Sequence, residues 1–296
     1  MPAPSDRSRW AVPTFLLLSF GLAWAIELGP VRRLGYGTLA GTLFLAVVML
    51  TPGLAAFVVR HLFEGGDFSD AGLRWGQGRY YLWAWLTPLG WLLVANALSV
   101  AVGLAVWDPN LSELVAQLRQ HNVQLTPEKL AQGRWLIPLA VLTWGSFINS
   151  FFAFGEELGW RGYLQMRWQE RFGVSRGFLL VGLVWGLWHA PVILLGHNYP
   201  KHPRLGVLLM VGFCILLSFF FGWLRLRSGS VFVPSLAHGA LNAQVAGGAV
   251  FLKNYDTTIA TPLGVVGMAV FAVFLFVLWR WLPLSPAAES SAGKRW

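Results

Sequence analysis

Apolar stretches long enough to cross a lipid bilayer recur along the whole chain, and they constrain its fold more than any other feature. A helix needs about 20 apolar residues to cross roughly 30 Å of hydrocarbon. Eight such stretches lie at 11–28, 38–62, 80–106, 135–155, 177–197, 205–224, 230–252 and 262–282. Only 12% of the 296 residues are charged, about half the share that is usual in a soluble domain. The sequence therefore predicts an all-α fold, a polytopic membrane helix bundle of about eight transmembrane helices.

The distribution of positive charge predicts how this bundle lies in the membrane. Fourteen Lys and Arg residues fall on the side of the N-terminus and eight on the opposite side. By the positive-inside rule, both termini face the cytoplasm. The chain is rich in Trp, Gly and Ala and poor in Lys, which favours an integral protein of a bacterial inner (plasma) membrane, with the lipid bilayer as its partner. No continuous basic stripe is present, so we expect no binding to nucleic acid.

The first apolar stretch has two interpretations. Arg7 and Arg9 precede it, and Ala23-Trp24-Ala25 resembles the cleavage site of a signal peptide. However, the stretch is longer than a usual signal core and is followed by Glu27. We therefore expect a retained helix.

The longest polar segment, 108–134, connects the third and fourth apolar stretches. Leucine and valine at helical spacing, followed by Thr126-Pro127-Glu128 as a capped helix start, predict one or two short interfacial helices. The segment is either a plain connector or a lid over a site that opens on the non-cytoplasmic side.

Charged side chains inside a membrane cost a few kcal/mol each, which makes them candidates for function. Most of the thirteen carboxylates lie in loops, in tails or at the ends of apolar stretches. The exceptions are Glu156 and Glu157, which close one apolar stretch. Two histidines, His189 and His238, fall inside apolar stretches. The carboxyl pair and the two histidines are therefore the candidate functional groups.

Helical spacing separates the two carboxylates. Glu157 and Arg161 are four residues apart, so they share a helix face and can form an ion pair. Glu156 points about 100° away and lacks that partner, which suits it to act as a general base. The alternative is that both residues simply face water at the membrane boundary.

His189 lies two residues before Pro191, so its helix should be kinked close to the imidazole. The distorted turn can leave a backbone carbonyl free for a polar partner. Trp185 lies one turn earlier on the same face. A histidine inside such a helix can be a catalytic residue or a structural hydrogen-bonding residue, and both interpretations stay open.

His238 and Asn242 are four residues apart on the next polar helix, and Pro234 marks its first turn. Both side chains can donate hydrogen bonds toward one point, as an oxyanion requires. Small residues at four-residue spacing should let the neighbouring helices approach closely. They are Gly239, Ala243 and Gly247 in this helix, and Gly182 and Gly186 in the helix of His189.

The combination is more specific than its parts. Glu156-Glu157-Leu158-Gly159-Trp160-Arg161, then Trp185-Gly186-Leu187-Trp188-His189, then His238-Gly239-Ala240-Leu241-Asn242 resemble, in this order, the three motifs of the CPBP family. These are the CAAX proteases and bacteriocin-processing enzymes, also called the Abi family of intramembrane proteases. The resemblance covers about residues 135–250. The second motif usually begins with Phe, whereas this chain has Trp185.

The resemblance implies roles for these residues. Glu156 would be the general base, assisted by His189, while His238 and Asn242 would form an oxyanion hole. Glu157, Arg161 and Trp185 would support them. The implied activity is that of an intramembrane endopeptidase of CAAX prenyl protease type. Its substrate would be a peptide or a membrane protein, with a prenylated C-terminus in eukaryotic relatives.

Three other interpretations stay open. The chain could be a catalytically inactive membrane scaffold or a bacteriocin-immunity protein of the same fold, or it could be a transporter. One Glu and two His could also hold a catalytic zinc ion. We expect no metal and no cofactor, because the H-E-x-x-H spacing is missing and a zinc site would not require Asn242.

The chain is thereby divided into three parts. Residues 1–134 hold the N-terminal transmembrane helices and the connecting loop. Residues 135–252 hold the catalytic core of CPBP type, and residues 253–296 hold the last transmembrane helix and a cytoplasmic tail.

Overall fold

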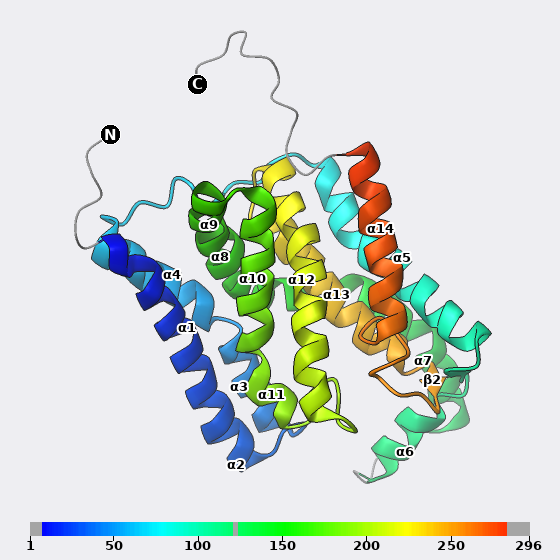
Figure 1. Ribbon diagram of the computed structural model, residues 1–296. Coiled ribbons are helices and arrows are strands. Elements are labelled where there is room, and N and C mark those ends of the chain that lie inside the picture. Colours follow the sequence, from blue (N-terminus) through cyan, green and yellow to red (C-terminus); the bar gives the residue numbers. More distant parts are fainter. Residues whose placement is uncertain (1–7, 121–123, 283–296) are drawn as a thin grey trace.

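A computed structural model describes residues 8–120 and 124–282, and it shows a bundle of helices that run mostly along one direction (Figure 1). The first half contains η1 Ser8–Trp10, α1 Ala11–Ile26, η2 Glu27–Val31, α2 Arg32–Leu34, α3 Leu39–Val48, α4 Thr51–Phe63, α5 Arg79–Ala101, β1 Val106–Trp107 and α6 Ser112–Gln120. The second half contains α7 Pro127–Ala140, η3 Val141–Gly145, α8 Ser146–Gly159, η4 Trp160–Leu164, α9 Gln165–Phe172, α10 Val174–Trp188, α11 Ala190–Leu194, α12 Pro203–Ser228, α13 Phe232–Ala249, β2 Leu252–Lys253 and α14 Val265–Trp281. The segments η2, η3 and η4 are π-helical.

The helices confirm the predicted membrane bundle. Within the described residues, five continuous helical segments are long and apolar enough to cross a membrane, namely Ala11–Leu34, Leu39–Phe63, Arg79–Ala101, Pro127–Phe172 and Pro203–Ser228. Helices α10 and α14 are shorter and apolar, and α13 covers most of the seventh predicted stretch. Helix α1 begins and α14 ends toward the same end of the bundle (Figure 1). The 283–296 part of the predicted tail lies outside the described residues.

The structure corrects some predicted boundaries. The stretch predicted at 135–155 belongs to the much longer segment Pro127–Phe172. This segment begins where Thr126 caps it, because the Thr126 hydroxyl accepts a hydrogen bond from the backbone N–H of Lys129 at 3.3 Å. The predicted helix start is therefore confirmed, but it opens a long helix instead of a short interfacial one. Only α6 is a separate short helix in the described part of 108–134.

Glycines set the spacing of the helices around the centre of the bundle. Helix α10 packs on α12, and a methyl group added at Gly182 would lie 2.5 Å from the Cα atom of Ile215. Helix α13 packs on α8 and α5, and a methyl group at Gly239 would lie 2.2 Å from the backbone nitrogen of Ser150. The small residues therefore permit the close helix contacts that the sequence predicts.

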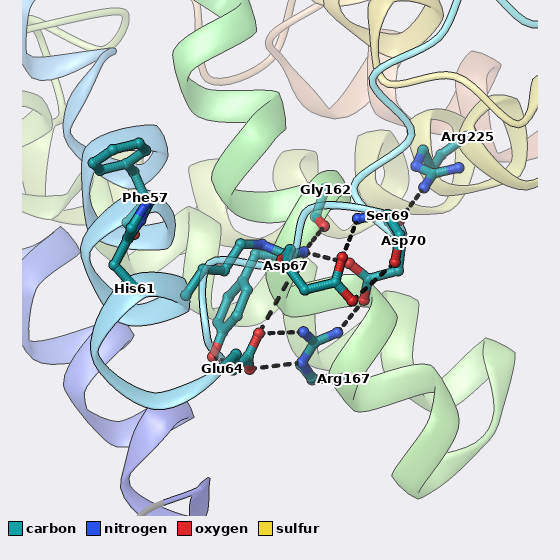
Figure 2. Close-up of polar contacts among 11 residues, drawn as sticks. Phe57, His61, Glu64, Asp67, Ser69, Asp70, Gly162, Arg167 and Arg225 are labelled. Atoms are coloured by element: carbon teal, nitrogen blue, oxygen red, sulfur yellow. Dashed lines mark hydrogen bonds and ion pairs between the residues drawn. The ribbon is translucent and has the colours of Figure 1, made fainter.

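A polar network ties the helices together around the loop that follows α4 (Figure 2). The guanidinium of Arg60 lies 2.6 Å from the carboxylate of Asp70 and donates to the carbonyl oxygen of Gly162 at 2.9 Å. Arg167 forms ion pairs with Asp70 and with Glu64. These contacts join α4, η4 and α9, so the helix of Glu156 is held at its C-terminal end.

Candidate active site

A cavity of about 670 Å³ lies inside the bundle, and the four residues with predicted catalytic roles all line it. They are Glu156, His189, His238 and Asn242. The walls come from α3, α5, α8, α10, α12 and α13, from η2, and from the segments around 197–198 and 255–263. The fold thus brings together side chains that are up to 86 positions apart in the sequence (242 minus 156).

Glu156 lies near the end of α8 and is 2% exposed. Its Oε2 atom accepts a hydrogen bond from the indole nitrogen of Trp185 at 2.8 Å. Glu157 is fully buried. The interpretation that both carboxyl groups face water at the membrane boundary is therefore wrong, because α8 continues into η4 and α9 and carries both groups into the protein interior.

Glu157 connects two charged or chargeable groups through one oxygen. Its Oε1 atom accepts a hydrogen bond from Arg161 at 2.9 Å, which is the predicted ion pair. The same atom lies 2.9 Å from Nδ1 of His238. Because a carboxylate can only accept hydrogen bonds, Nδ1 of His238 is the donor. The orientation of the His238 ring is therefore fixed by Glu157.

Trp185 lies at the centre of the cluster. The guanidinium of Arg161 stacks over its ring at 4.2 Å from the ring centroid. Its ring centroid lies 5.8 Å from that of His189 and 5.3 Å from that of His238. The helical spacing in the sequence places Trp185 and His189 on one face, and the structure brings their rings together. The indole N–H bond to Glu156, which a Phe at this position could not make, was not predicted.

His189 lies where the helix is interrupted, as the sequence predicts. Helix α10 ends at Trp188 and α11 starts at Ala190. The backbone N–H of His189 bonds to Gly186 at 3.3 Å, and its side-chain Nδ1 donates to the carbonyl oxygen of Trp185 at 2.8 Å. The carbonyl that the distorted turn releases thus holds the imidazole, and Nε2 is the nitrogen left for chemistry.

Several other groups in the cavity wall were not predicted from the sequence. Glu27 lies at the end of a predicted apolar stretch, yet it is 1% exposed and lines the cavity. Asn96, Asn149 and His197 also line it. The prediction that only the Glu156–Glu157 pair is intramembrane is therefore wrong for Glu27. Its π-helical turn, which the sequence pattern does not show, carries it inward.

Two further features of the site bear on the remaining predictions. Among the described residues, no three His, Cys, Asp or Glu side chains are grouped so that they could hold a metal ion. A second cavity of about 480 Å³ is lined in part by Glu113 of α6 and shares Tyr255 and Thr257 with the cavity of Glu156. That the polar segment 108–134 acts as a lid stays a prediction.

The segment that carries the three motifs is similar to known proteins. Residues 135–244 match the family described as type II CAAX prenyl endopeptidase Rce1-like. The CAAX prenyl protease 2 of Methanococcus maripaludis is 43% identical to this chain over 44 residues, which are 15% of this chain and 16% of that protein. The aligned region is thus a small part of this relative. The matched segment, residues 135–244, carries the three motifs and the four candidate residues, and both comparisons support the resemblance to the CPBP family.

Proposed function

We propose that the protein is an intramembrane endopeptidase of CAAX prenyl protease type that hydrolyses a peptide bond in the cavity. The observation that carries this proposal is that four side chains with suitable chemistry line the same cavity, namely Glu156, His189, His238 and Asn242. Its substrate is a peptide or a membrane protein, and a prenylated C-terminus fits the similarity to a CAAX prenyl protease. A scaffold would have no need of this convergence.

In the proposed mechanism, Glu156 removes a proton from water, and the resulting hydroxide attacks the carbonyl carbon of the peptide bond. His189 assists through Nε2, because its Nδ1 proton is engaged by the Trp185 carbonyl. The Trp185 indole holds one oxygen of Glu156 in place. Proton return from Glu156 or His189 to the leaving nitrogen then completes the cleavage.

His238 and Asn242 stabilise the negative oxygen of the tetrahedral intermediate. Nδ1 of His238 is engaged by Glu157, so the donor to the oxyanion is Nε2. Both ring nitrogens must then carry protons, which makes His238 an imidazolium in the reacting state. The carboxylate of Glu157 accepts the hydrogen bond from Nδ1 of His238, and Arg161 forms an ion pair with the same carboxylate.

The test uses the full chain in lipid nanodiscs and a farnesylated CAAX peptide with a fluorophore and a quencher on opposite sides of the scissile bond. We expect cleavage by the wild type and loss of cleavage in Glu156→Gln and in His238→Ala. Glu170 is an exposed carboxylate on α9, so Glu170→Gln is the matched control and should cleave normally. Full activity in Glu156→Gln or His238→Ala, with correct folding shown by circular dichroism, contradicts the proposal.

A further inference from the structure

Glu27 is a buried carboxyl in the active cavity that the mechanism above does not use. It begins η2, a π-helical turn that contains Pro30 and follows α1. π-Helical turns inside α-helices are rare and occur frequently at functional sites. Glu27 is 1% exposed, lines the same cavity as Glu156 and interacts electrostatically with that residue.

Two indole hydrogen bonds hold α1, which precedes Glu27, against α10, the helix that ends just before His189. Trp24 donates to the backbone carbonyl of Trp188 at 3.0 Å, and Trp188 donates to the backbone carbonyl of Ser19 at 3.1 Å. The carboxyl of Glu27 also interacts with the backbone N–H of Val192, three residues after His189. Glu27 is therefore held rigidly beside the turn that carries His189, as a binding residue requires.

The carboxyl has bonding capacity that the protein leaves unused. The Oε2 atom of Glu27 has no hydrogen-bond partner, and neither does Oδ1 of Asn96 on α5. Both residues line the cavity. A buried acceptor without a donor costs free energy, because it has lost its hydrogen bonds to water and gained none in the protein. Such acceptors in a cavity wall indicate a ligand that brings donors.

The remaining wall residues narrow the chemistry of that ligand. Among the described residues that line the cavity, none is Lys or Arg, while two are Glu. A carboxylate or phosphate would therefore find no Lys or Arg side chain as a counter-ion there. A peptide in an extended conformation instead presents backbone N–H groups, which are hydrogen-bond donors. Glu27 and Asn96 both lie outside residues 135–244, the segment that matches the protease family.

We propose that Glu27 binds the substrate by accepting a hydrogen bond from a backbone N–H of the peptide in the active cavity. The inference rests on the proposed function. It assigns part of substrate recognition to the N-terminal helices, whereas the matched segment supplies the chemistry of cleavage.

The variant Glu27→Gln distinguishes a role of Glu27 in substrate binding from a role in the stability of the fold. The amide has nearly the same size and keeps one oxygen for the Val192 N–H, but it replaces the second acceptor with an NH₂ donor. We expect KM for the farnesylated peptide to rise about tenfold, as for the loss of one hydrogen bond. We expect kcat to change by less than about threefold, because only binding is lost. Glu170→Gln should leave both constants unchanged.

A set of farnesylated peptides, each methylated at one backbone nitrogen, identifies the donor. One of these peptides should raise the KM of the wild type about tenfold and have no further effect on Glu27→Gln. An unchanged KM in Glu27→Gln overturns the proposal, as does equal sensitivity of both proteins to every methylated peptide. A lowered melting temperature without a methylation-specific effect assigns Glu27 a structural role only and also overturns it.

Failure of the proposed function gives a different result. If the wild type cleaves no peptide, binding of the unmethylated peptide is measured by fluorescence anisotropy in Glu156→Gln, with and without Glu27→Gln. About tenfold weaker binding in the double variant supports the role of Glu27. Equal binding, or no binding to either protein, overturns it.

Discussion

Glu157 Oε1 lies 2.9 Å from Nδ1 of His238, and this contact joins α8 to α13 across 81 positions of sequence. The contact fixes which ring nitrogen of His238 faces Glu157 and which is left for the cavity. Glu157→Gln keeps the size of the side chain but replaces the charge-assisted hydrogen bond to Nδ1 of His238 with a weaker, neutral one. We expect kcat to fall about 100-fold with little change in KM, because a poorer oxyanion donor acts only on the transition state.

The measurement is steady-state cleavage of the farnesylated peptide by Glu157→Gln in nanodiscs. Binding of the same peptide to Glu156→Gln, with and without Glu157→Gln, serves as its control and should be equal. A kcat within about threefold of the wild type would show that His238 does not depend on Glu157.

Trp185→Phe tests the indole hydrogen bond to Glu156. Phe is the usual residue at this motif position, and it keeps an aromatic ring beneath the Arg161 guanidinium. Because the 2.8 Å hydrogen bond and part of the buried ring system are removed, we expect kcat to fall by no more than about tenfold and stability by about 1–3 kcal/mol. Trp185→Ala removes the ring as well, and we expect a loss of about 3–5 kcal/mol. Thermal unfolding in nanodiscs measures both, and equal losses in the two variants would contradict this division.

Metal removal tests the expectation that hydrolysis needs no metal. In the proposed mechanism Glu156 activates water and His238 with Asn242 supplies the oxyanion donors, so each role has a protein group. We expect full activity after dialysis against EDTA and 1,10-phenanthroline, and less than about 0.1 zinc per chain by mass spectrometry of the active protein. Loss of activity that added zinc restores would establish the zinc alternative.

The sequence predicts much of this site because its main signals are local. The i, i+4 spacing is enough to pair Glu157 with Arg161, and Pro191 is enough to interrupt the helix at His189. Contacts between helices are different, since helical spacing within one segment does not say which neighbour a face meets. The bond from Trp185 to Glu156 and that from His238 to Glu157 are of this kind.

Glu27 shows a second limit. Its position at the end of an apolar stretch favours a boundary residue, and a π-helical turn has no simple sequence signature. The packing of Trp24 and Trp188, two residues far apart in the sequence, helps to bring that turn against the helix of His189. The membrane bundle could thus be predicted from hydropathy, whereas the N-terminal wall of the cavity could not.

Gly239→Ala tests whether close contact of α13 with α8 is needed. The added methyl group would lie 2.2 Å from the backbone nitrogen of Ser150, so the two helices must separate. We expect a loss of about 1–3 kcal/mol and lower activity, because His238 precedes Gly239 directly. Gly212→Ala is the matched control, since its methyl group would meet only the sulfur of Met268 at 3.8 Å. Equal melting temperatures for the two variants would show that the helices adjust freely.

Arg60→Ala tests the network around the loop after α4. The guanidinium of Arg60 is almost completely buried and contacts both the Asp70 carboxylate and the Gly162 carbonyl. Its removal leaves buried acceptors without donors, so we expect a loss of about 2–4 kcal/mol in stability. The active cavity does not include this arginine, so kcat below the melting temperature should stay within about twofold of the wild type. Arg176 is exposed, and Arg176→Ala should leave the melting temperature unchanged. If Arg60→Ala lowered kcat without changing the melting temperature, the network would have to act on the catalytic groups directly.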